Sequence, residues 1–187
     1  VTGMGLVTSL GRSKDETWAA MAAGRSGIRR ITRFPTDGLR TTIAGTVDPS
    51  GSEPYLGPDL CFEMAISAAQ EAIAQSRIGG RQFPGPLFLA TPPAELAWEQ
   101  RFALSRASAD TSKSGYPKLM AAARTGRFRH VFEHYQFASV ADRLADGIGS
   151  KGLPISVSTA CASGASAIQL GVEAIRRGDA EAVISVG

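Results

Sequence analysis

The sequence predicts an α/β protein with a mostly parallel sheet. Short apolar, β-branched segments alternate with segments whose apolar residues recur at i, i+3 and i+4, which indicates strands separated by helices. The helical segment that follows Cys161 is apolar around most of its circumference, so we expect it to be buried on several sides. Both observations favour helices layered on a sheet.

Local signals place the elements of the first half. Ser13 is positioned to cap a helix that Gly24 ends, because Glu16 follows Ser13 in capping-box register. The apolar stripe of this helix is expected to be Trp18, Met21 and Ala22. The other expected elements are a strand over 1–7, an irregular segment over 26–37, a strand over 39–47 and a helix over 60–78.

The second half continues the alternation. A short buried strand is expected over 86–90, followed by the turn Thr91-Pro92-Pro93. Helices are expected over 94–108, 131–144 and 162–177, and strands over 153–157 and 182–186. Cys161 therefore stands where a strand turns into a helix.

Bulk properties exclude several classes. A length of 187 residues, 43% hydrophobic content and 20% charged content fit one soluble globular domain. A net charge of +3 does not suggest a nucleic-acid partner. No run of about 18 apolar residues predicts a membrane span, and no signal peptide is recognisable, so we expect a cytoplasmic protein.

The cysteines and histidines narrow the chemistry. Cys61 and Cys161 are far apart with no C-x-x-C spacing, which argues against a disulfide scaffold or a zinc site. His130 and His134 are four residues apart, but without an H-E-x-x-H order we expect no metal and assign them no catalytic role.

Cys161 is the main candidate for chemistry, with two open interpretations. A lone cysteine among small residues is often only a small buried hydrophobe. At a helix N-terminus, however, the dipole favours the thiolate, and unpaired N–H groups can bind the oxyanion of an acyl intermediate. The second interpretation makes Cys161 an acyl-accepting nucleophile.

Three stretches carry a family resemblance: residues 1–8 with Gly11, residues 158–171, and residues 173–180 with 186–187. Over 1–187 the chain resembles the N-terminal half of a β-ketoacyl-acyl carrier protein synthase, a condensing enzyme with the duplicated thiolase-like fold. An excursion is expected at about 92–130. Cys161 falls on the acyl-accepting cysteine of that family.

The resemblance implies a reaction and partners. An acyl group moves from a carrier's phosphopantetheine to Cys161, and malonyl-acyl carrier protein then condenses with it after losing carbon dioxide, in fatty-acid or related lipid synthesis. The resemblance implies no bound cofactor. It does imply a homodimer. The family's two catalytic histidines and lysine lie on its C-terminal half, so we expect these 187 residues to be inactive alone: a fragment, an incompletely described chain or one member of a split pair.

Other functions remain open at this point. The alternatives are a polyketide-type ketosynthase, another thiolase-fold acyltransferase, and a non-catalytic partner subunit like a chain-length factor. The presence of Cys161 speaks against the last, because such partners tend to lack the cysteine.

The resemblance also implies substrate contacts. Thr159, Ala160 and Ala162 would line the pocket beside Cys161. Pro93 would lie near its gate, where the family usually has a glycine-rich turn. The basic residues Arg124, Arg127 and Arg129 would either dock an acidic acyl carrier protein or form an ordinary solvated face.

Overall fold

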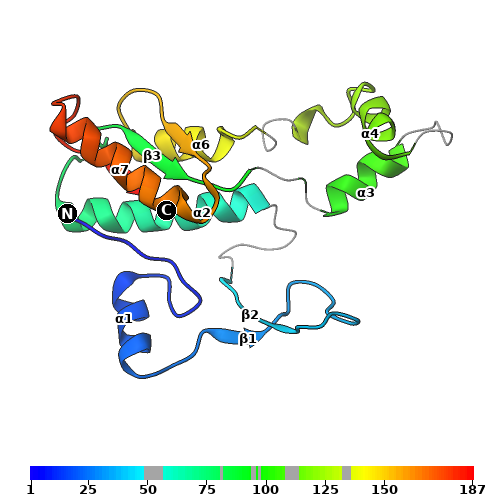
Figure 1. The fold of residues 1–187 in the computed structure, drawn as a ribbon, viewed down its shortest axis with the longest axis horizontal. Coiled ribbons are helices and arrows are strands. Elements are labelled where there is room, and N and C mark those ends of the chain that lie inside the picture. Colours follow the sequence, from blue (N-terminus) through cyan, green and yellow to red (C-terminus); the bar gives the residue numbers. More distant parts are fainter. Residues whose placement is uncertain (49–56, 81, 94–95, 97, 108–113, 132–135) are drawn as a thin grey trace.

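A three-stranded parallel sheet forms the centre of the structure (Figure 1). The computed structural model describes residues 1–48, 57–80, 82–93, 96, 98–107, 114–131 and 136–187. Strand β3 (Leu87–Ala90) lies between β4 (Ile155–Val157) and β5 (Ile184–Val186). In register, Phe88 stands opposite Ile155 on one side and Ser185 on the other. The predicted parallel sheet is confirmed, with each strand slightly shorter than expected.

Helices cover both faces of this sheet. Leu87 and Leu89 of β3 pack in a cluster with α2 (Gly57–Ser76) and α6 (Ser139–Ile148). Phe88, whose side chain points to the opposite face, packs against Ala167 and Ala174 of α7 (Ser163–Arg176). The structure therefore has three layers. Because both faces of β3 are covered by helices, its sequence is a continuous run of apolar residues.

The contact between α2 and α6 builds the larger core. Leu144 of α6 is fully buried with Leu87. Arg143 ties the two helices at their edge, because its guanidinium donates to Asp59 at 2.7 Å and lies 4.3 Å from the centre of the Phe62 ring.

Small residues bring α7 close to β5. A Cβ added at Gly171 would lie 2.7 Å from the Ser185 hydroxyl oxygen, and that hydroxyl donates to the Ala167 carbonyl at 3.0 Å. The opposite side of α7 is open: Ile168 is 59% exposed and Ile175 is 47% exposed. The predicted burial of this helix on several sides is therefore met on one side only, because no element of the described residues covers the other.

The strand expected over residues 1–7 is wrong. This segment lies along α2, whose side chains take its N–H groups: Met4 donates to Gln75 at 2.8 Å and Leu6 donates to Glu71 at 2.9 Å. Gly5 approaches so closely that a Cβ would meet a backbone oxygen of α2 at 2.0 Å. Hydrogen bonds from these backbone N–H groups to side chains of α2 thus replace the hydrogen bonds that a neighbouring strand would have made.

Helix α1 (Lys14–Ala22) begins as predicted, since the Ser13 hydroxyl accepts the Glu16 N–H at 3.2 Å. Its predicted apolar stripe is wrong. Trp18 is 69% exposed, and the helix buries Thr17 and Ala20 instead.

An antiparallel hairpin follows, formed by β1 (Ile28–Arg30) and β2 (Ile43–Gly45). Residues 28–30 were expected to be irregular, and the strand expected over 39–47 is only three residues long. In Figure 1, α1 and this hairpin lie beside the layered body, on the α2 side.

The segment between β3 and α6 contains two described helices. α3 (Trp98–Ala107) and α4 (Gly115–Ala123) pack against each other, and the short 3-10 helix η1 (Arg129–Val131) follows (Figure 1). The helix expected over 131–144 begins later, at Ser139, and residues 132–135 lie outside the described part. No described helix is both long and apolar enough to cross a membrane.

Candidate active site

Cys161 lies just beyond the carboxyl end of β4, in the 3-10 turn η2 (Ala160–Ala162) that leads directly into α7. The neighbouring strand β3 ends at the same edge, where the Thr91 N–H donates to the Val157 carbonyl at 3.1 Å. Ligands of open α/β sheets bind outside the carboxyl ends of the strands. The predicted strand-to-helix placement of Cys161 is confirmed.

The backbone of this turn is unusual at Ala160. Its φ is +52°, in the left-handed region that alanine adopts only at a cost. This sharp turn leaves the Cys161 side chain exposed. No described residue accepts a hydrogen bond from the Cys161 N–H. A thiol and a free N–H on one residue can supply the nucleophile and one oxyanion donor for acyl transfer.

Three hydroxyl groups hold the turn. The Ser163 hydroxyl accepts the Thr159 N–H at 2.8 Å and donates to the Ala160 carbonyl at 2.7 Å. The Ser166 hydroxyl donates to the Ala162 carbonyl at 3.1 Å and lies 3.2 Å from the Thr159 hydroxyl. Sequence reasoning missed Ser163 and Ser166, although serine in a first helical turn is a signal for hydroxyl–backbone bonding.

Electrostatics separate the two cysteines. The 14-residue helix α7 has no acidic residue in its first turn, so its N-terminal dipole is not offset where Cys161 stands. Cys61 is half-buried on α2, and this burial raises the pKa of its thiol. The neutral thiol is a poor nucleophile, so its environment makes Cys61 poorly suited to reaction.

The structure brings the predicted pocket residues to one edge of the sheet. Thr159, Ala160 and Ala162 flank Cys161 and are exposed, and Pro93 is exposed three residues after the end of β3. The described residues form no tunnel or cleft above Cys161, which is exposed. The outer wall of such a cleft would need a layer on the open side of α7.

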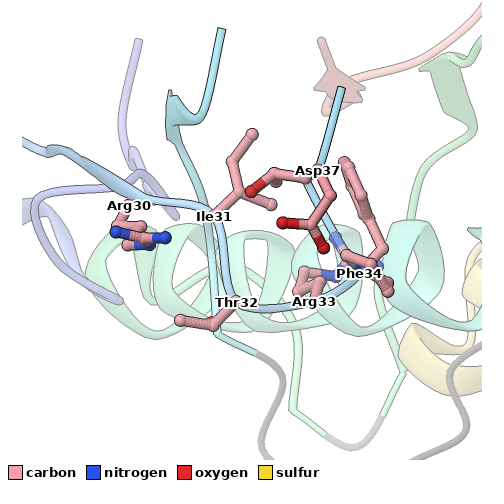
Figure 2. A pocket seen from close by; sticks show the side chains of 8 residues that line it. Arg30, Ile31, Thr32, Arg33, Phe34 and Asp37 are labelled. Carbon is pink, nitrogen blue, oxygen red and sulfur yellow. The ribbon is translucent and has the colours of Figure 1, made fainter. Parts of the chain in front are cut away.

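Two concavities of the described residues lie elsewhere. One has a volume of about 420 Å³ and lies in the loop after β1, where Figure 2 shows Arg30, Phe34 and Asp37 around it. The other, of about 400 Å³, lies between the end of α2 and Ile148 of α6. Neither contains Cys161.

The basic cluster is separate from the cysteine turn. Arg124 ends α4, Arg127 follows in the next turn and Arg129 begins η1; all three are exposed. His130 is exposed on η1, with its ring stacked on Phe128 at 6.5 Å between centroids. His134 lies outside the described residues. Within the described part of the chain, no three His, Cys, Asp or Glu side chains gather as a metal site would require.

These features define a three-layered α/β protein. Its exposed cysteine lies just before α7, a helix that buries one side against the sheet. The chain belongs to the β-ketoacyl synthase family: the family described as "Beta-ketoacyl synthase, N-terminal domain" matches residues 1–187. The predicted family is confirmed.

Relatives in this family differ in pathway. The chain is 26% identical to a putative polyketide β-ketoacyl synthase 1 of Streptomyces cyaneus, over 99% of the chain and 44% of that protein. It is also 26% identical to 3-oxoacyl-[acyl-carrier-protein] synthase 2 of Vibrio cholerae, over 100% of the chain and 44% of that protein. The chain thus spans less than half the length of these relatives.

Solved structures share the thiolase-like fold. The ishigamide ketosynthase/chain length factor superposes with a TM-score of 0.69 at 21% identity, covering 99% of this chain and 45% of that one. A β-ketoacyl synthase from Burkholderia phymatum gives a TM-score of 0.66 at 23% identity, covering 99% and 45%. The predicted fold is confirmed, and so is its extent of about half of the solved chains.

Proposed function

We propose that the protein containing this chain is a condensing enzyme in which Cys161 accepts the acyl group. The observation that carries this proposal is the Cys161 turn. An exposed thiol follows a positive-φ residue at the N-terminus of α7, in a chain of the β-ketoacyl synthase family. No bound cofactor takes part, because the phosphopantetheine arrives on an acyl carrier protein.

The first half-reaction uses groups described here. The Cys161 thiolate attacks the carbonyl carbon of the acyl thioester, and the resulting oxyanion accepts a hydrogen bond from the Cys161 N–H. The bond between that carbon and the carrier sulfur then breaks. The carrier leaves as a thiolate that takes up a proton, and the acyl group remains on Cys161.

The second half-reaction forms the carbon–carbon bond. A malonyl thioester loses carbon dioxide, its α-carbon attacks the acyl-Cys161 carbonyl, and Cys161 leaves as the thiolate. The groups that stabilise the enolate in this step are proposed to lie outside residues 1–187.

Intact-mass spectrometry of the full-length protein with an acyl-carrier thioester tests the first step. We expect one acyl adduct, lost in Cys161→Ala and kept in the matched control Cys61→Ala. An adduct that persists in Cys161→Ala, or a wild-type protein that takes no label, refutes the proposal.

We further propose that Arg124, Arg127 and Arg129 dock the acidic carrier. Charge complementarity steers association, so reversing Arg124 and Arg127 to glutamate should raise the KM for carrier substrates and spare small thioesters. The matched control reverses Arg30, at the end of β1, and Arg33, in the loop that follows; both are exposed basic residues as well. Equal effects of both double variants, or of both substrates, would show that the cluster is an ordinary charged face.

The fatty-acid and polyketide roles are distinguished by product. We favour fatty-acid or related lipid synthesis, for which one elongation per cycle is expected when acyl and malonyl carriers are supplied. Several successive elongations without reduction would favour a polyketide-type ketosynthase. A ketosynthase/chain length factor is among the similar structures, so the mass of the intact assembly decides between the proposed homodimer and a pair of unlike subunits.

Pro93 is proposed to stiffen the gate of the acyl pocket, since proline fixes φ and lacks an N–H. Pro93→Gly should change the relative rates with short and long acyl carriers. An unchanged chain-length profile removes the idea.

A further inference from the structure

The Ser163 hydroxyl bridges the turn that presents Cys161. It accepts the Thr159 N–H at 2.8 Å and donates to the Ala160 carbonyl at 2.7 Å, so both hydrogen-bonding roles of one hydroxyl are used. Ser163 is 9% exposed, whereas Thr159 and Ala160 are exposed. Its bonds therefore meet little competition from water.

The residue inside this bridge is the strained one. Ala160 has a φ of +52°, and a residue with a Cβ keeps such a conformation only when its surroundings hold it there. The peptide groups on both sides of the Thr159–Ala160 pair bind the same hydroxyl. Ser163 thus restrains the rotation that would return Ala160 to the right-handed region.

The hydroxyl groups of Ser163 and Ser166 also determine which backbone groups beside Cys161 have a hydrogen-bond partner. The carbonyls of Ala160 and Ala162, which flank Cys161, each accept a hydroxyl hydrogen bond. The Cys161 N–H, by contrast, has no acceptor among the described residues. A relaxed turn would rotate this N–H, because the peptide unit that carries it follows directly on Ala160.

We propose that Ser163 is a positioning residue for acyl transfer: its hydroxyl holds the left-handed turn at Ala160 and thereby aims the Cys161 N–H at the forming oxyanion. This inference rests on the proposed function of Cys161. It predicts that Ser163 matters for attack on a thioester carbonyl, which develops an oxyanion, and not for alkylation of the thiol, which develops none.

The test measures both reactions of Cys161 in the full-length protein. Ser163→Ala should lower kcat for acyl transfer by about 10-fold to 100-fold, less than the loss of a whole oxyanion donor, with KM unchanged. Its rate of alkylation by chloroacetamide should stay within about threefold of wild type, because that displacement needs no oxyanion donor. Ser158→Ala, an exposed serine beside the turn, is the matched control and should leave both rates unchanged.

Two rescue variants separate positioning from folding. Ser163→Thr keeps a hydroxyl and should retain most of the acyl-transfer rate. Ala160→Gly permits positive φ without strain, so the double variant Ala160→Gly/Ser163→Ala should recover much of the kcat lost in Ser163→Ala.

Three results would overturn the inference: wild-type acyl transfer by Ser163→Ala, a parallel fall in alkylation and acyl transfer, or no recovery in the double variant. A failure of the proposed function looks different. In that case Cys161→Ala is acylated as well as wild type, whatever stands at position 163.

Discussion

The close seating of α7 on β5 can be tested by adding a single methyl group. Gly171 faces the sheet, and a Cβ there would lie 2.7 Å from the Ser185 hydroxyl oxygen and 2.9 Å from a Val183 methyl carbon. Both distances are shorter than packed atoms tolerate. Gly171→Ala must therefore push α7 away from β5 or turn Ser185 out of its bond to the Ala167 carbonyl.

The size of the effect follows from opposing terms. Alanine in place of glycine favours a helix by about 1 kcal/mol. Against this stand about 1–3 kcal/mol for overpacking and about 1 kcal/mol for the lost Ser185 hydrogen bond. The net expectation is a loss of about 1–3 kcal/mol in the free energy of unfolding.

Urea denaturation followed by circular dichroism measures this loss. Gly164→Ala is the control on the same helix, because its added Cβ would lie 3.4 Å from the nearest backbone atom, an ordinary contact. That variant should be as stable as wild type or more stable by up to about 1 kcal/mol, because the helix-propensity gain is not opposed by a clash. If Gly171→Ala is as stable as wild type, α7 does not lie too close to β5 for a Cβ at this position. Close packing would then not explain the small residues on this side of α7.

Three further predictions concern the core, the first segment and the second cysteine. Leu144→Ala removes a fully buried side chain and should cost about 2–5 kcal/mol in unfolding free energy by denaturant titration; a cost below 1 kcal/mol would contradict its central place. Glu71 accepts the N–H groups of Leu6 and Lys14, both at 2.9 Å, so Glu71→Ala should speed hydrogen exchange at those two amides and leave the sheet protected; unchanged exchange would show that the N-terminal segment is held otherwise. Burial raises the pKa of the Cys61 thiol in the folded protein, so the unfolded state binds fewer protons above the ordinary thiol pKa of about 8.5 and stability should fall as pH rises beyond it. Cys61→Ala should flatten that alkaline slope in a pH series of melting curves, and an unchanged slope would assign it to other groups.

Periodicity predicted the layered body because its elements bury apolar faces. The strand around Leu87 was predicted correctly because it is a short, buried apolar run. The helix around Ala69 was predicted correctly because its apolar residues recur at helical spacing and are buried. The start of α1 read correctly because Ser13 acts on its own neighbours.

The sequence predictions are wrong where contacts with residues far away in the sequence determine the local structure. Residues 1–7 look like a strand, yet Glu71 and Gln75 of α2 supply the partners that a sheet would have supplied. Trp18 and Met21 have helical spacing but face solvent in the described residues. The contribution of Ser163 depends on φ at Ala160, which no pattern of small residues reveals.

The same limit applies to the site. The position of Cys161 followed from the strand-to-helix order, and its place at the edge shared with Pro93 follows from β3 and β4 being adjacent and parallel. That adjacency needs the sheet order, which local sequence does not contain.

The sheet order also determines when this site can form. Phe88 of the central strand pairs with Ile155, 67 residues later, and Leu87 pairs with Ile184, 97 residues later. Pairings between such distant residues carry a large loop-closure entropy and form slowly. During synthesis the three-stranded sheet cannot be completed until β5 has been made. The Cys161 turn lies in the connection between β4 and β5, so we expect it to gain its final shape only when β5 docks on β3. Among the elements of residues 1–187, we therefore expect the Cys161 turn to take its final shape later than the contact between α2 and α6.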